Sequence, residues 1–236
     1  KERAIFLAVS ESITIITDEK KKVQKGTIPE LLKEALSVSF DTNVGHDFVE
    51  DAESRFEYYH KKEAKIPFDI EMLNKITKGG FTDGTLNLFL GGTNSGKTLF
   101  MCHLASSYLH QGYNVLYVTL EIAEEEIAKR IDANLMNMKM SEITTISKDN
   151  FLSKINKIRA KTIGKLKIKQ YPPASVNINH FRALLNELNL KKSFVPDIII
   201  IDYLGICLSA RVKSAENSFN YYKSVAEEIR GLAVER

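Results

Sequence analysis

The sequence predicts an α/β fold with a mostly parallel sheet and helices on both of its faces. From residue 85 onward, short apolar runs alternate with longer amphipathic runs, which is typical of βαβ units. A phosphate-binding motif lies between one of these expected strands and the helix that follows it. A later apolar strand ends in Asp202, as a buried parallel strand beside a metal site would. Together these three observations indicate a P-loop nucleotide-binding domain.

The elements of this domain follow from the alternation of apolar patterns, with boundaries good to a few residues. Strands are expected at 85–90, 114–120, 166–170 and 198–202. Helices are expected at about 97–110, 123–137, 149–161, 179–190 and from about 217 onward.

The first residues predict a separate helix. Apolar residues in 1–17 fall near one helical stripe, and although the run at 12–17 would also suit a strand, we favour the helix. The lysine-rich run at 18–26 is typical of a solvated connector. We therefore expect residues 1–26 to form a separate helix with its connector, and residues 27–236 to form the P-loop domain. The stripe comprises Ile5, Ala8, Val9, Ile13 and Ile16.

Composition excludes several classes of function. The chain has 33 Lys and Arg against 30 Asp and Glu, so no global positive field favours nucleic acid, and any DNA contact must be local. Cys102 and Cys207 lie in apolar runs outside any CxxC spacing, which indicates buried thiols in a reducing compartment. The five histidines lack metal-site spacing and are expected to serve packing or the surface.

The chain is expected to remain in the cytoplasm and to be a piece of a longer protein. It has no apolar run of membrane-spanning length and no signal-peptide layout. It opens with Lys1 and stops at Arg236 within a helical pattern. We therefore expect the fold to be incomplete at its C-terminus.

The phosphate-binding motif G-x-x-x-x-G-K-[ST] is matched in full. Its glycines let several backbone N–H groups face phosphate, and the helix that follows adds the positive end of its dipole. Lys97 is suited to neutralise the β and γ oxygens of ATP, and the hydroxyl of Thr98 is suited to Mg²⁺. The motif comprises Gly91, Gly92, Thr93, Asn94, Ser95, Gly96, Lys97 and Thr98.

Two acids complete the expected site. Asp202 ends the strand 198–202 and takes the position of the Walker B aspartate that orients the metal. Many ATPases follow it with a catalytic glutamate, but here Tyr203 stands next, so the base must come from elsewhere. Glu121, at the end of the strand 114–120, is our candidate.

The rival role of Glu121 is to cap the helix that carries Glu124, Glu125 and Glu126. Because Tyr203 stands where many ATPases have the catalytic glutamate, the catalytic role of Glu121 is favoured. Arg130 is expected to form an i, i+4 ion pair with Glu126.

These motifs resemble the RecA-like motor domain of DnaB-type replicative helicases, most closely the group found in T4-like phages. The segments 66–68, 73–80, 129–134 and 202–207 are similar to that group as well, so the likeness covers nearly the whole chain. The resemblance implies ATP and Mg²⁺ as ligands, a homo-hexamer at full length, movement along single-stranded DNA, and cooperation with a primase and other replication proteins. Residues 1–17 would correspond to the linker helix that docks on a neighbouring subunit.

Several parts that the resemblance implies lie outside this chain: a glutamine sensor, the main DNA-binding loop, an arginine finger and an N-terminal collar domain. One DNA-facing candidate remains in the polar stretch 209–216, where Arg211 and Lys213 would meet the backbone. An ordinary surface loop is an equal alternative, because two basic residues give a weak electrostatic footprint.

Three other functions compete. A small-molecule P-loop kinase would use the same Lys97 and Thr98, but Glu121 suits the activation of water, and no arginine-rich lid follows Asp202. A RecA-like recombinase-type ATPase differs mainly in the segments 73–80 and 129–134. The third rival is a nucleotide-binding scaffold without hydrolysis.

The implied strand order leaves a gap in the sheet. In RecA-like motors a strand later in the sequence inserts between the strands that correspond here to 85–90 and 198–202. Each unpaired buried N–H or C=O costs about 1–3 kcal/mol. The two strands are therefore expected to close onto each other, to pair with a second copy, or to belong to a longer chain, and this piece is not expected to form hexamers.

Overall fold

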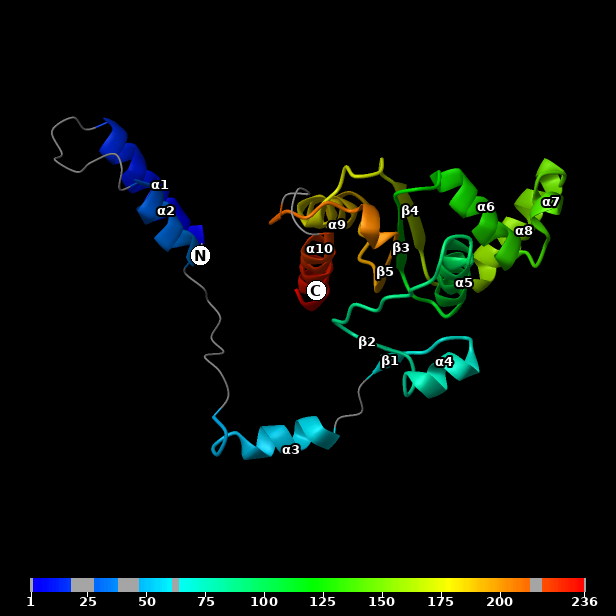
Figure 1. Cartoon of the computed structure of the whole chain (residues 1–236), viewed down its shortest axis with the longest axis horizontal. Coiled ribbons are helices and arrows are strands. Elements are labelled where there is room, and N and C mark those ends of the chain that lie inside the picture. Colours follow the sequence, from blue (N-terminus) through cyan, green and yellow to red (C-terminus); the bar gives the residue numbers. More distant parts are fainter. Residues whose placement is uncertain (1, 18–27, 38–46, 61–63, 213–217, 236) are drawn as a thin grey trace. The chain divides into compact units, whose positions relative to one another are not determined.

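A computed structural model of the chain describes residues 2–17, 28–37, 47–60, 64–212 and 218–235. Its contacts divide the chain into two compact units, Lys1–Lys62 and Glu63–Arg236, whose elements are labelled in Figure 1. The division expected after residue 26 rests on the lysine-rich run 18–26, which lies outside the described residues, and it stays a prediction.

The first unit contains three helices, α1 (Glu2–Thr17), α2 (Ile28–Ser37) and α3 (Ala52–His60). The predicted helix at 1–17 is therefore confirmed. α1 packs on α2, and α1 buries Ala8, Ser12 and Ile15; the Ser12 hydroxyl donates to the Ala8 carbonyl at 2.6 Å. Ala8, Ser12 and Ile15 are buried on one face of the helix, whereas Ile13 and Ile16 of the expected stripe are more than half exposed.

A parallel three-stranded sheet in the order β4–β3–β5 forms the centre of the second unit (Figure 1). The strands are β3 (Val115–Thr119), β4 (Leu166–Gln170) and β5 (Ile198–Asp202), so three of the predicted strands are confirmed. Thr119 lies opposite both Gln170 and Asp202. The carboxyl ends of all three strands therefore meet at one edge of the sheet.

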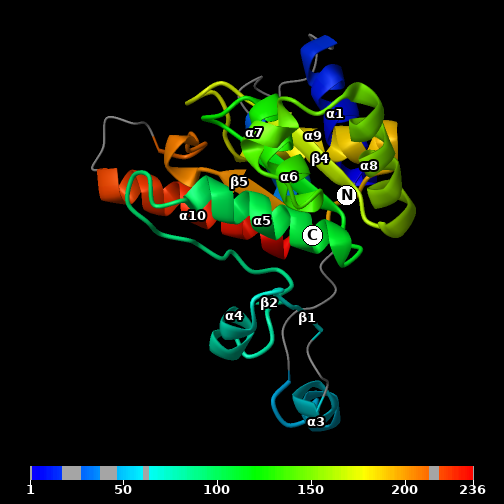
Figure 2. The same ribbon diagram turned by 90° about the vertical axis from the view of Figure 1, so that its right-hand side faces the viewer.

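Helices cover both faces of this sheet, as the sequence predicted (Figures 1 and 2). On one face, α5 (Lys97–His110) and α6 (Glu124–Leu135) form a core with Tyr117 and Ile200. On the other face, α9 (Ile178–Lys192) and α10 (Ser218–Val234) form a core with Leu116 and Val118. Successive residues of β3 thus point into opposite cores.

The remaining elements lie around this three-layer core. They are β1 (Lys65–Ile66), α4 (Glu71–Ile76), β2 (Phe81–Thr82), α7 (Met140–Ile143), α8 (Lys148–Lys161) and the 3-10 turn η2 (Leu204–Ile206). β1 and β2 pair antiparallel, and the ring of Phe68 lies 4.6 Å from that of Phe81. Gly80 allows this pairing, because its φ is 125° and a Cβ there would lie 2.0 Å from the Ile66 carbonyl oxygen.

Helices α5, α6, α8, α9 and α10 agree with the predicted ranges to within two residues at each end. The predicted strand at 85–90 was wrong. That segment has no strand partner among the described residues, and Leu88 and Leu90 are 56% and 94% exposed. Its physical cause is the gap in the sheet: a strand exists only through its ladder, and β5 pairs with β3 on one edge while no described segment reaches the other. Of the three expected ways to resolve the gap, direct closure of the two strands does not occur.

Tyr108 on α5 and Tyr117 on β3 lie wholly buried in the same core, and their hydroxyls differ in environment. The Tyr117 hydroxyl donates to the Asp202 carboxylate at 2.9 Å, whereas the Tyr108 hydroxyl has no hydrogen-bond partner in the described part of the chain. Burial, with smaller contributions from Cys102 and Asp202, raises the pKa of Tyr117 well above its usual value, so its hydroxyl stays protonated as a donor. Asp202 is 2% exposed and depends on such a donor.

Tyr117→Phe should lower the free energy of unfolding by about 1–3 kcal/mol, because it leaves a buried carboxylate oxygen without its donor. Tyr108→Phe is the matched control: it removes a hydroxyl without a partner from the same core and should change stability by less than about 0.5 kcal/mol. Urea denaturation followed by circular dichroism measures both. Equal losses in the two variants would show that the Tyr117–Asp202 bond contributes nothing.

Candidate functional site

The phosphate-binding motif forms a tight loop that ends where α5 begins. Gly96 precedes the helix with φ 89°, and Asn94 is also left-handed with φ 59°. At Gly91 a Cβ would lie 2.4 Å from the Ser95 hydroxyl oxygen, so a larger residue there would displace the Ser95 side chain. Gly96 offers no side-chain cap, which leaves the first N–H groups of α5 available to an anion.

The ammonium group of Lys97 lies within this loop. Its Nζ donates to the carbonyls of Gly91 at 2.9 Å and Gly92 at 2.7 Å. No ion pair joins Lys97 to a carboxylate of the described residues. A cation held by carbonyls alone retains its attraction for anions, so the loop fits the phosphates of a nucleotide.

The direction of α5 places this loop near the carboxyl edge of the sheet. The ring of Tyr108, late in α5, lies 6.1 Å from that of Tyr113, just before β3, whereas the sulfur of Cys102 lies 4.0 Å from the Tyr117 hydroxyl within β3. The helix therefore runs antiparallel to the strand. Lys97 lies five residues before Cys102, or about 7.5 Å along the axis, and the end of β3 lies about 7 Å beyond Tyr117. The start of α5 and the carboxyl end of β3 therefore lie at nearly the same height along the sheet.

Asp202 lies at this edge, where its carboxylate is held by Tyr117 from the neighbouring strand. Sequence patterns predict Asp202 but not Tyr117. A signal was present, because a tyrosine within a buried apolar strand needs a partner for its hydroxyl. Only the pairing of β3 with β5 reveals which acid supplies it.

Glu121 follows β3 on the same edge. The backbone N–H of Leu120 donates to the Asp202 carbonyl at 2.9 Å, which extends the ladder one residue past the strand. Thr119 then folds the chain back through bonds with Ile122, accepting at 3.2 Å and donating at 2.6 Å. Glu121 is left exposed at the tip of this turn, with no hydrogen bond to the described residues.

The geometry disfavours the capping role of Glu121. α6 begins at Glu124 after an N-cap at Ala123 that makes no side-chain cap bond. Glu124 instead accepts a hydrogen bond from the backbone of Gln170 at 3.0 Å, joining α6 to the end of β4. Glu121 is therefore free to act at the edge, although its catalytic role stays a prediction.

The ion pair expected between Glu126 and Arg130 was wrong. In the described chain Glu126 faces Lys129, with Nζ 4.0 Å from Oε1. The i, i+3 partner thus takes the place of the i, i+4 partner on this helix.

Of the two candidate DNA contacts, Arg211 is exposed and Lys213 lies outside the described residues. Arg211 has no ion pair within the described residues, so its guanidinium is available to a phosphate.

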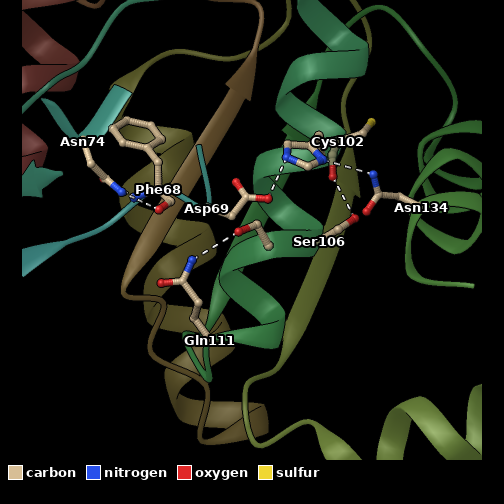
Figure 3. Close-up of polar contacts among 9 residues, drawn as sticks. Phe68, Asp69, Asn74, Cys102, Ser106, Gln111 and Asn134 are labelled. Carbon is tan, nitrogen blue, oxygen red and sulfur yellow. Dashed lines mark hydrogen bonds and ion pairs between the residues drawn. The ribbon is translucent and has the colours of Figure 1, made fainter. Parts of the chain in front are cut away.

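A separate polar cluster fixes the outer side of α5 (Figure 3). The Asp69 carboxylate accepts from His103 Nε2 at 2.8 Å, and His103 Nδ1 lies 3.2 Å from the Asn134 amide nitrogen. Asp69, His103 and Asn134 border a hollow of about 510 Å³. These contacts tie α5 to α6 and to the segment after β1, so His103 has the packing role that the sequence predicted. The described residues hold no group of three or more potential metal-ligating side chains, and His46 lies outside them.

Comparisons with known proteins show what the chain is similar to. The family model "DnaB-like helicase C terminal domain" matches residues 66–236. The DnaB-like replicative helicase of Enterobacteria phage T4 is 49% identical over 247 residues, which cover 100% of this chain and 52% of that protein. The chain therefore spans about half the length of this relative.

Solved structures share the fold. A DnaB-like replicative helicase, studied together with its interactions with primase, aligns over 99% of this chain and 54% of its own with a TM-score of 0.66 and 17% identity. An ATPase domain aligns over 78% of this chain and 64% of its own with a TM-score of 0.60 and 19% identity. The α/β fold with its parallel sheet is thereby confirmed. Because the family model matches residues 66–236, which are most of the chain, the chain belongs to the DnaB-like helicase family.

Proposed function

We propose that this chain is the ATP-hydrolysing motor of a replicative DNA helicase, which moves along single-stranded DNA and unwinds the duplex. The observation that carries the proposal is the convergence of the loop before α5, Glu121 and Asp202 at the carboxyl edge of the sheet. Ligands bind at this edge in α/β folds. Membership in the DnaB-like helicase family favours this function over the recombinase and kinase alternatives.

Each residue has a distinct role in this proposal. The loop 91–96 and the first turn of α5 bind the phosphates of ATP, and Lys97 neutralises their oxygens. Thr98 and Asp202 would hold Mg²⁺, which supplies charge neutralisation at the phosphates when bound. Glu121 orients the attacking water and accepts its proton. Tyr117 keeps the Asp202 carboxylate in place.

The partners follow from the family. We propose a homo-hexamer for the full-length protein, with single-stranded DNA, a primase and other replication proteins as partners in the cytoplasm of a phage-infected bacterium. α1 supports the subunit contact, because it exposes the apolar residues Phe6, Val9, Ile13 and Ile16, which are 41–70% exposed. None of the helices within the described ranges has the length and apolarity to cross a bilayer.

The scaffold without hydrolysis is the second candidate. It would retain the loop and Lys97 but make no use of the exposed carboxylate of Glu121. The two functions therefore differ in chemistry and not in binding.

Lys97→Ala should weaken the binding of Mg²⁺-ATP and Mg²⁺-ADP by roughly 10- to 100-fold or more, because the loop loses its charged donor. Lys157→Ala, on an exposed position of α8, is the control and should leave affinity unchanged. Calorimetric titration decides the matter: unchanged affinity in Lys97→Ala would refute the site.

Glu121→Gln in the full-length protein should keep nucleotide affinity while hydrolysis falls about 100- to 10,000-fold, since the amide retains the shape and loses the base. Glu125→Gln, the same change at an exposed position in the first turn of α6, should leave hydrolysis intact. Phosphate release and nucleotide titration are measured in parallel. Near-normal turnover of Glu121→Gln, with a loss of stability alone, would favour the capping role.

A further inference from the structure

The segment that carries Arg211 is connected to the sheet by short backbone contacts. After β5 the chain passes η2 and runs beside the segment that follows β4: Ala174 donates to the Ile206 carbonyl at 3.1 Å, and Leu208 donates to the Val176 carbonyl at 2.7 Å. The chain therefore reaches Ser209 in a defined position, seven residues after Asp202.

A buried glutamate of α10 then holds the backbone of this segment. Glu228 is 4% exposed, and its carboxylate accepts hydrogen bonds from the Ser209 hydroxyl at 2.6 Å, the Ala210 N–H at 2.9 Å and the Arg211 N–H at 3.3 Å. The Ser224 hydroxyl donates to the same carboxylate at 3.2 Å. Successive N–H groups directed at one carboxylate form an anion nest within the protein itself.

A second set of contacts closes the turn. The Ser209 hydroxyl oxygen accepts from the N–H groups of Arg211 at 3.1 Å and Val212 at 3.0 Å. The Tyr221 hydroxyl, also on α10, accepts from the Ser209 N–H at 3.2 Å and donates to the Cys207 carbonyl at 3.4 Å. Residues 209–212 are thus fixed by side chains of α10 and not by a strand or helix of their own.

Hydrogen bonds from this segment stabilise the ionised form of Glu228. Burial raises its pKa, but the bonds from Ser209, Ala210, Ser224 and Arg211 outweigh burial, and the net pKa lies below its usual value. No Lys or Arg forms an ion pair with Glu228 within the described residues. A carboxylate is costly to bury, and here the hydrogen bonds from Ser209, Ala210, Arg211 and Ser224 offset that cost, while Arg182 attracts Glu228 only at longer range.

We propose that Glu228 is a positioning residue that holds residues 209–212 so that Arg211 presents its guanidinium to the phosphate backbone of single-stranded DNA. The inference rests on the proposed function and adds a residue of α10 to it. Because the segment follows Asp202 along the chain, Glu228 also keeps the DNA-facing side chain at a fixed place relative to the nucleotide edge.

The test compares Glu228→Gln with Glu227→Gln, Arg211→Ala and the double variant Glu228→Gln/Arg211→Ala in the full-length protein. Glu227 is the exposed neighbour on α10. Hydrogen exchange of residues 209–212, measured without DNA, reports whether Glu228 holds this segment. Anisotropy of a fluorescent oligothymidylate reports DNA affinity, and calorimetry reports affinity for Mg²⁺-ADP.

In Glu228→Gln we expect exchange at residues 210–212 to accelerate and DNA affinity to fall, each by about tenfold or more, because the amide turns an N–H group toward backbone donors. Arg211→Ala should weaken DNA binding similarly, and the double variant should lose no more than either alone. In Glu228→Gln the DNA concentration for half-maximal stimulation of ATP hydrolysis should rise, while turnover at saturating DNA and ADP affinity stay unchanged. Glu227→Gln should match the wild type.

The outcomes separate the two proposals. Unchanged exchange in Glu228→Gln would show that Glu228 does not hold residues 209–212. Faster exchange with unchanged DNA affinity would overturn the positioning role of Glu228. Loss of ADP affinity together with DNA affinity overturns it as well, because the damage would then be general. A wild-type protein that binds ADP but no single-stranded DNA overturns the proposed function, and this inference with it.

Discussion

The pairing of β3 with both of its neighbours is the constraint on which the rest of this structure depends. All five residues of the strand are buried, and Thr119 lies opposite both Gln170 and Asp202. A slip of one residue would exchange the two cores, moving Tyr117 away from α5 and away from Asp202. The register therefore sets at once which side chains fill each layer, where Asp202 lies, and where the turn that exposes Glu121 begins.

Buried polar groups extend this order from the sheet to the loops. Tyr117 links the central strand to Asp202, and Glu228 links α10 to the backbone of residues 209–212. Each costs free energy to bury unless its hydrogen bonds are made, so each favours a single arrangement of the segments it joins. The edge that carries Asp202 and the segment that carries Arg211 are in this way parts of one sheet-based framework, which the proposed coupling of ATP to DNA would use.

Local chemistry made much of this predictable from the sequence. The loop, three strands and the helices α5, α6, α8, α9 and α10 follow from local sequence patterns, whereas α4 and α7 were not predicted. The strand expected at 85–90 failed because a strand depends on a partner, which no local pattern reveals. Tyr117 and Glu228 were missed for a similar reason: their partners lie 85 and 18 residues away in the sequence, and only the fold brings them together.

The central claim is that the edge formed by the loop, Glu121 and Asp202 hydrolyses ATP in response to DNA. The most direct measurement is steady-state ATP hydrolysis by the full-length protein, with and without single-stranded DNA and with and without Mg²⁺. The account predicts hydrolysis that requires Mg²⁺ and rises when single-stranded DNA is added. Tight binding of ATP with no hydrolysis under any of these conditions would contradict it and identify the chain as a nucleotide-binding scaffold.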